Sequence, residues 1–274
     1  MPPPALPPDP IGLRHSDRAV LIGASGTGKS TLAAELLNRF RRDYPHARIL
    51  VLDTKPRWRG ERLPDGRDAR RLYRGFAPGD TIPGAVTMSQ MRDWTLAWDH
   101  DTNPTQTVIA QRVQTDWKDR QANHANTLAY VVACAERFFG TQRVKTPSLL
   151  YLDEGHDFFH SSGQARGTDI VQRCYRAGRE RGLATLAGFQ RPSGLNLQVL
   201  TELNYCALFR INFAKDVKKL YDMGWPEGVP PPDYEPNGEE SFTFRLWRGK
   251  PTAPTYRLNP RTTAHTSKEA RHAS

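Results

Sequence analysis

The chain has 274 residues, and its 39 lysines and arginines outnumber its 29 aspartates and glutamates, which leaves a formal net charge of +10. That length fits one large domain or one domain with appendages. No apolar run approaches the roughly 18 to 20 residues that a membrane-spanning helix needs, and the N-terminus MPPPALPPDP lacks the basic and apolar regions of a signal peptide. We therefore expect a cytoplasmic protein without a membrane span.

The ends of the chain differ in composition from its middle. Residues 1–16 predict a proline-rich arm, either a strap onto a neighbouring subunit or a loose tail. Residues 259–274 are polar and predict a disordered tail. Between them, residues 17–258 predict one domain, with a short C-terminal β extension from about residue 213. Three widely spaced cysteines (Cys134, Cys174 and Cys206) favour buried free thiols over disulfides or a zinc site.

Strand-like and helix-like patterns alternate along this domain. Expected strands lie at residues 18–24, 48–53, 107–110, 148–154, 183–189 and 206–212, and expected helices at 30–41, 121–139 and 169–181. Residues 241–248 and 255–258 predict a hairpin or edge strands, and residues 222–238 predict a loop. Continuous apolar strands that alternate with helices predict an α/β fold, with a mainly parallel sheet flanked by helices.

A phosphate-binding loop follows the first expected strand and opens the first expected helix. Residues 23–30, GASGTGKS, fit the pattern G-x-x-x-x-G-K-[ST] at every position. Backbone N–H groups and the helix dipole would hold the phosphates, while Lys29 would reach the β- and γ-phosphates and Ser30 would hold Mg²⁺. The pattern predicts nucleoside triphosphate contacts from these residues: Gly23, Ser25, Gly26, Thr27, Gly28, Lys29, Ser30 and Thr31.

Two carboxylates end the apolar strand LLYLDE, which has the form of a Walker B motif. Asp153 is placed to hold Mg²⁺ through a water, and Glu154 is placed to polarise the attacking water. The expected strand at 183–189 would lie beside this one and present Gln190 to the γ-phosphate or the lytic water. Paired acids favour hydrolysis over a nucleotide-gated switch. His156 and Asp157 follow and receive no assignment.

The combined motifs resemble the FtsK–HerA superfamily of ring-shaped DNA-pumping ATPases. The resemblance runs from about Arg18 to Asn212 and depends most on RAGRERG, a strand, and then QRPS. It implies a RecA-like core, ATP with Mg²⁺ as cofactors, and a homo-oligomeric ring, a pentamer or hexamer, around double-stranded DNA. It also implies a catalytic arginine that acts on the neighbouring subunit. Arg179 matches that position best and Arg176 is the alternative, although either could be a solvated helix residue or contact DNA.

The short segment before the core makes the chain resemble the viral genome-packaging ATPases of this superfamily. Such a motor would work in the host cytoplasm, docked on a portal or vertex protein of the capsid. A cluster of basic residues supports DNA as the track: residues 55–74 contain eight basic side chains against three acidic ones. Lys55, Arg57 and Arg59 begin this cluster and are the predicted DNA contacts, since phosphate contacts are independent of base sequence. A solvated arginine-rich surface is the alternative.

Three other functions remain open at this point. A plasmid or conjugative DNA transfer or segregation ATPase would share the chemistry and differ in its partners. An ATP-dependent assembly switch would bind nucleotide without sustained turnover, which the acid pair disfavours. A small-molecule kinase would need an arginine-rich lid, and residues 173–181 are the candidate for that lid.

Overall fold

A computed structural model describes residues 11–45, 47–53, 70–71, 107–111, 135, 138–140, 147–159, 169–195, 197–222, 224–232 and 242–258. The strands are β1 (Arg18–Ile22), β2 (Arg48–Asp53), β3 (Arg70–Arg71), β4 (Thr107–Gln111), β5 (Ser148–Leu152), β6 (Leu183–Phe189), β7 (Tyr205–Leu208), β8 (Phe242–Trp247) and β9 (Thr255–Leu258). The α-helices are α1 (Lys29–Asp43), α4 (Asp169–Ala177), α5 (Leu197–Glu202) and α6 (Ala214–Asp222). Three 3₁₀ turns complete the described elements: η1 (Gly155–Asp157), η2 (Arg179–Arg181) and η3 (Pro192–Gly194).

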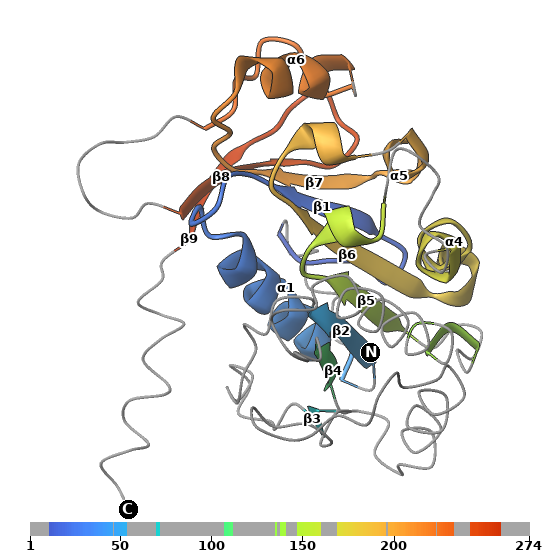
Figure 1. Ribbon diagram of the computed structural model, residues 1–274. Helices are drawn as coiled ribbons and strands as arrows, with labels where there is room; N and C mark the ends of the chain where they lie inside the picture. The colour runs from blue at the N-terminus through green and yellow to red at the C-terminus, as the bar shows by residue number, and fades with distance from the viewer. Residues whose placement is uncertain are drawn as a thin grey trace, which may run out of the picture.

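The described strands form one sheet in the order β3-β4-β2-β5-β6-β1-β7-β8-β9 (Figure 1). Every pair from β3 to β7 is parallel, and β8 and β9 extend the sheet with antiparallel pairs. The α/β prediction is confirmed, including the neighbouring positions of β5 and β6. Because all the parallel strands point the same way, their C-terminal ends meet at one edge of the sheet, where ligands bind in such folds.

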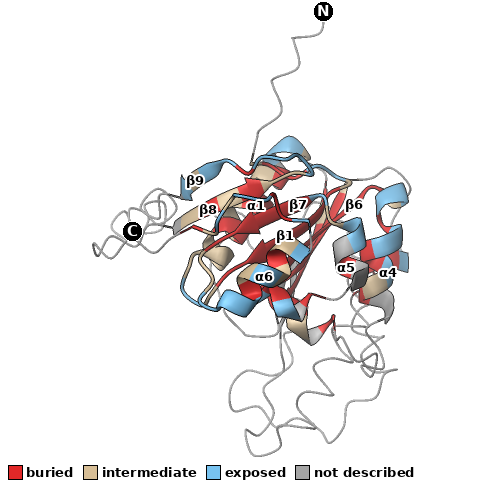
Figure 2. Cartoon of the chain, turned by 90° about the horizontal axis from the view of Figure 1, so that it is seen from above, coloured by how far each residue is buried: buried red, intermediate tan, exposed pale blue. Residues whose placement is uncertain are grey.

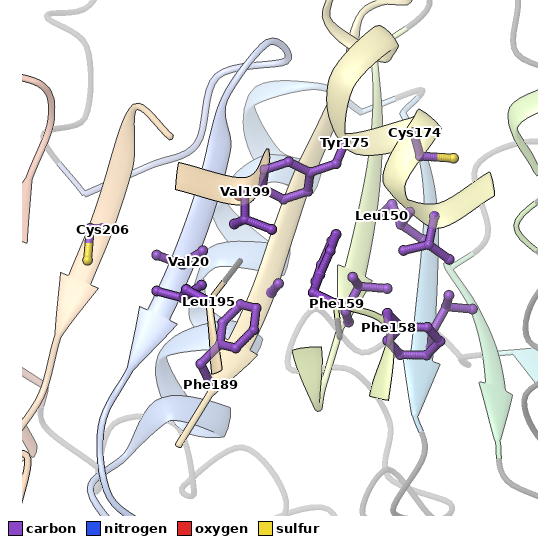
Figure 3. Close-up of a cluster of buried hydrophobic side chains, with 14 of the residues drawn as sticks. Val20, Leu150, Phe158, Phe159, Cys174, Tyr175, Phe189, Leu195, Val199 and Cys206 are labelled. Carbon is purple, nitrogen blue, oxygen red and sulfur yellow. The ribbon is translucent and has the colours of Figure 1, made fainter. Parts of the chain in front are cut away.

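Each face of the sheet has its own hydrophobic core, because side chains alternate between the two faces of a strand. In β1, Ala19 and Leu21 belong to the core under α1, whereas Val20 and Ile22 belong to the core under α4 and α5. Figure 2 shows strands β1, β6 and β7 buried and the outward-facing sides of α4 and α6 exposed. Figure 3 shows Tyr175 of α4 and Val199 of α5 in the second core. The central strands are covered on both faces, which explains their uninterrupted apolar sequences.

Several expected elements have other bounds than predicted; for example, the strand expected to reach residue 24 ends at Ile22. The expected helix 169–181 ends at Ala177. It continues through Gly178 into the 3₁₀ turn η2, which Gly182 ends with a left-handed φ of 70°. The strand expected to reach residue 212 ends at Leu208. After it, the carbonyl of Arg210 accepts a hydrogen bond from the P-loop residue Ala24, and α6 then begins at Ala214. The strand expected to reach residue 154 ends at Leu152, so both carboxylates lie in the turn after it. Helix α5 and strand β3 were not predicted. The segment expected as a C-terminal β extension from about residue 213 begins with helix α6, and its strands start only at Phe242.

Several expectations lie outside the described residues. They include most of the expected helix 121–139, nearly all of the basic cluster 55–74, Cys134, and residues 1–10 and 259–274. At the start of the described chain, Leu13 is buried and Ile11 accepts a hydrogen bond from Tyr205 Oη at 3.0 Å. This part of the predicted arm therefore lies against the core. Cys174 and Cys206 are buried free thiols, as expected.

Within the part of the chain that the structure describes, no helix is both long and apolar enough to cross a bilayer.

Candidate nucleotide-binding site

The P-loop joins the end of β1 to the start of α1. Gly26 and Gly28 have φ of 78° and 101°, a left-handed backbone that side chains with a Cβ rarely adopt, so glycine is needed at both places. The hydroxyl of Thr27 donates to the carbonyl of Ala24 at 2.8 Å and closes the turn. The N-terminus of the 15-residue helix α1 therefore points into the centre of the P-loop. This end of the helix dipole is positive and favours an anion.

Lys29 lies across the P-loop. Its ammonium group donates to the carbonyl oxygens of Gly23 at 2.6 Å and Ala24 at 2.7 Å. These contacts hold a positive charge over the loop, beside the backbone N–H groups of the helix start. A phosphate that enters the loop therefore meets both a fixed charge and oriented amide dipoles.

The turn after β5 carries the two carboxylates. Asp153 and Glu154 are each only 7% exposed. Asp153 Oδ1 accepts a hydrogen bond of 2.7 Å from the buried hydroxyl of Tyr151, two residues earlier on the same face of the strand. The peptide N–H of Asp153 also donates to Leu52 O on β2 at 3.1 Å. Asp153 is therefore fixed by contacts on its own strand and on the neighbouring one.

Gln190 follows β6 and reaches across to Glu154. Its side-chain amide Nε2 lies 3.3 Å from Glu154 Oε1 and 3.2 Å from Oε2. The parallel pairing of β5 with β6 brings these residues together, since Leu152 is the register partner of Ala187. An amide that donates to a carboxylate holds that carboxylate in one orientation.

These elements enclose one cavity of about 270 Å³ at the C-terminal edge of the sheet. Its lining combines P-loop residues with side chains from the ends of β5 and β6: Ser25, Gly26, Gly28, Lys29, Ser30, Thr31, Tyr151, Asp153, Glu154 and Gln190. Of the predicted P-loop contacts, Gly23 and Thr27 shape the loop without lining the cavity. The cavity is positive on the P-loop side and negative on the β5 side.

The donor set fits Mg²⁺ bound together with phosphates. Among the described residues, no group of three or more His, Cys, Asp or Glu side chains could hold a metal ion. Ser30 and Asp153 nevertheless line the same cavity and offer a hydroxyl and a carboxylate. Magnesium usually keeps several waters and takes one or two protein oxygens plus substrate phosphates, so these two residues suffice.

The two arginines expected to act in catalysis lie away from this cavity. Arg176 is on α4 and Arg179 is in η2, both exposed and both on the N-terminal side of β6. Burial lowers the pKa of Arg18 at the start of β1, and Arg179 is among the charges that add to this shift. The predicted DNA contacts Lys55, Arg57 and Arg59 lie outside the described residues.

Sequence reasoning missed two side chains at the site. Tyr151 was assigned only to the strand, although its place two residues before Asp153 puts both on one face. His156 received no role, but its Nε2 accepts a hydrogen bond of 3.3 Å from the backbone N–H of Gln190. Sequence spacing contains no signal for that contact, because the two residues are brought together by strand pairing.

The edge of the sheet thus has the organisation of P-loop NTPases, the class to which the fold and the site assign the chain. No protein-family model and no curated protein matches the sequence. Solved structures match in fold. VirB4 of Thermoanaerobacter pseudethanolicus is 12% identical, with a TM-score of 0.50, over 88% of this chain and 88% of that one.

Two further solved structures show lower TM-scores. The genome packaging NTPase B204 from Sulfolobus turreted icosahedral virus 2 is 11% identical with a TM-score of 0.49, over 90% of this chain and 98% of its own. The cytoplasmic domain of the Thermomonospora curvata type VII secretion ATPase EccC is 14% identical with a TM-score of 0.45, over 89% of this chain and 25% of its own. The VirB4 match, at 12% identity and a TM-score of 0.50, shows a shared fold, and the predicted α/β P-loop NTPase core is confirmed at that level.

Proposed function

We propose that the chain is an ATP-hydrolysing motor that translocates double-stranded DNA and packages a viral genome into a preformed capsid. The observation that carries the hydrolytic part is the contact of Gln190 with Glu154 across the cavity from the P-loop. A protein that only binds nucleotide needs the loop and a metal ligand. A second carboxylate, oriented by an amide, is the additional feature that water activation needs.

Each residue of the cavity has a distinct task in this proposal. Lys29 neutralises charge on the β- and γ-phosphates, and the P-loop N–H groups orient them. Ser30 and Asp153 hold Mg²⁺, which when bound supplies further neutralisation of phosphate charge. Glu154 accepts the proton of the attacking water. Gln190 keeps Glu154 oriented and contacts the γ-phosphate while that group is present.

A ring with active sites between subunits is supported by the placement of the arginines. Strand β6 has seven residues, and at about 3.3 Å per residue it separates Arg179 from Gln190 by roughly 20 Å. Arg179 is therefore too far along the sheet to serve its own cavity, and its exposure leaves it available to an adjacent subunit. We place Arg179 first and Arg176 second as the residue that neutralises γ-phosphate charge in trans.

Duplex DNA is proposed as the track because of the charge of the chain. The net charge is +10, and residues 55–74, with eight basic against three acidic side chains, contribute half of it. This segment follows β2, whose C-terminal end belongs to the same edge of the sheet as the cavity. Contacts to phosphates alone suit a motor that must move along any sequence, and they weaken strongly as salt rises.

The experiment that tests the proposal measures ATP hydrolysis with and without long double-stranded DNA at low and moderate salt. Wild-type protein should be stimulated by DNA, and the stimulation should fall with salt. Glu154→Gln should bind ATP but hydrolyse it at least about 100-fold more slowly. Nucleotide binding without any DNA response would refute an autonomous motor and favour an assembly switch.

A matched pair of triple variants separates specific DNA contacts from overall charge. Replacing Lys55, Arg57 and Arg59 by alanine should abolish DNA stimulation and leave basal hydrolysis unchanged. The control replaces three lysines of α6 and removes the same charge elsewhere: Lys215, Lys218 and Lys219. Equal loss in both variants would show that net charge, and not the 55–74 segment, binds DNA.

Subunit mixing tests the arginine in trans. Arg179→Ala and Glu154→Gln subunits should each be inactive alone. A mixed ring contains interfaces in which the intact Arg179 of one subunit faces the intact Glu154 of another, so partial activity should return. Absence of activity in mixtures that do assemble would contradict the assignment.

A further inference from the structure

Two side chains outside the nucleotide-binding motifs hold Gln190 on either side. Its backbone N–H donates to His156 Nε2 at 3.3 Å, and the next residue, Arg191, donates through Nε to Asp216 Oδ2 at 2.9 Å. We infer that His156 and Asp216 are positioning residues that fix Gln190 where its amide reaches Glu154. The inference rests on the proposed hydrolysis, which gives Gln190 and Glu154 their roles.

His156 is fixed by the turn that follows Glu154. In η1 the peptide N–H groups of Phe158 and Phe159 both donate to Gly155 O at 3.0 Å. The imidazole ring of His156 packs edge-on against Phe189, with centroids 5.3 Å apart and planes at 83°. Because Nε2 accepts the Gln190 N–H, the ring is in a form whose Nε2 carries a lone pair.

The His156 contact and the Glu154 contact join the same two segments. One segment runs from Glu154 to His156 after β5, and the other contains Phe189 and Gln190 at the end of β6. They pack without spare room, since a Cβ on Gly155 would lie within van der Waals overlap of the Phe189 ring. The backbone of Gln190 is therefore held in the position from which its side chain reaches the Glu154 carboxylate.

Asp216 acts from the other side of Gln190, in the first turn of α6. Its side chain is 2% exposed, whereas that of Arg191 is 48% exposed. A buried carboxylate needs a partner because desolvation of a charge is costly, and Arg191 supplies one. The guanidinium carbon of Arg191 also lies 4.5 Å from the centre of the Phe213 ring. The residue after Gln190 is thus anchored to α6, which limits how far Gln190 can move.

The two positioning residues should affect turnover more than binding, because neither lines the cavity. His156→Phe keeps an aromatic ring against Phe189 but removes the acceptor. His156→Gln supplies an amide oxygen near the position of Nε2 and can accept the same N–H. We expect His156→Phe to lower kcat by roughly 3- to 10-fold, the value of one hydrogen bond, with KM for ATP changed less than about 2-fold.

Rescue separates positioning from mere structural support. His156→Gln should recover most of the kcat that His156→Phe loses, whereas damage to folding would affect both variants. Asp216→Asn should lower kcat in the same way, with KM again little changed. Lys218→Ala is the matched control on α6, exposed and outside the Arg191 contact, and should retain wild-type kcat. Far-UV circular dichroism and melting of all four variants monitor folding.

Hydrogen exchange reads the same contact without any turnover. The Gln190 amide should exchange faster in His156→Phe than in wild type and should be protected again in His156→Gln. Wild-type kcat and wild-type Gln190 exchange in His156→Phe would overturn the inference. An inactive wild-type protein would instead refute the proposed hydrolysis, while the exchange of the Gln190 amide would still decide whether His156 holds it.

Discussion

The contact between Gln190 and Glu154 gives the sharpest quantitative prediction. Gln190→Ala removes an amide that donates to both carboxylate oxygens, at 3.3 and 3.2 Å. A hydrogen bond to a charged group contributes about 1.5–3 kcal/mol, and these long distances favour the lower end. At 1.36 kcal/mol per tenfold change in rate, kcat should fall by about tenfold. Binding of ATP should change little, because the P-loop is intact.

Gln190→Glu keeps the shape of the side chain and reverses the interaction. It places a second carboxylate about 3.2 Å from the first, where two charges at an effective dielectric constant of 20 repel by about 5 kcal/mol. The pair must take up a proton or move apart, and either response removes Glu154 as a positioned base. General-base catalysis contributes roughly 10²- to 10⁴-fold to the rate. We therefore expect Gln190→Glu to lower kcat by at least about 100-fold, which is a larger loss than that in Gln190→Ala.

Single-turnover hydrolysis, with ATP affinity measured separately, distinguishes these outcomes. In a Glu154→Gln background, Gln190→Ala should cost less than it does in the wild type, because only the proposed γ-phosphate contact of Gln190 is then left to lose. Gln172→Ala on α4 removes an amide that does not line the cavity and is the matched control. Hydrolysis by Gln190→Glu at the wild-type rate, or additive losses in the double variant, would refute the assigned contact.

Three more predictions follow from single residues. Lys29→Ala should weaken nucleotide binding by roughly 10- to 150-fold in titration calorimetry, the value of one charge-assisted contact, and unchanged affinity would remove Lys29 from the site. Gly155→Ala should lower Tm by roughly 2–10 °C, because the added Cβ overlaps the Phe189 ring, whereas Gly140→Ala meets nothing within 4 Å and should not lower it. Burial raises the pKa of Cys174 from 9.0 to about 12, so the folded state holds that proton more tightly and stability should fall as pH rises from about 9 toward 12. Urea unfolding at pH 8 and pH 10 should show a loss of about 1 kcal/mol from this thiol, and a rise in stability would contradict the sign.

The sequence by itself determined the local chemistry of the site. The P-loop pattern specifies its own conformation, because glycine is required where φ is positive and the following residues start a helix. The apolar strand before Asp153 and Glu154 specifies a buried position that ends at an edge. The uninterrupted apolar strands also predicted a sheet covered on both faces, which the two cores confirm. All of these properties depend on residues within a few positions of one another.

Tertiary structure decided which distant residues meet. Strand order and register place Gln190 against Glu154, and the same register brings His156 to the backbone of Gln190. Asp216 reaches Arg191 because the segment after β7 turns into α6 beside the end of β6. Sequence periodicity reports which face of an element is buried but not which element covers it. The position of Gln190 beside the Walker B strand was predicted from the sequence. Its contact with Glu154, and the contacts made by His156 and Asp216, follow from how the whole sheet and its helices pack, so the folded structure was needed to find them.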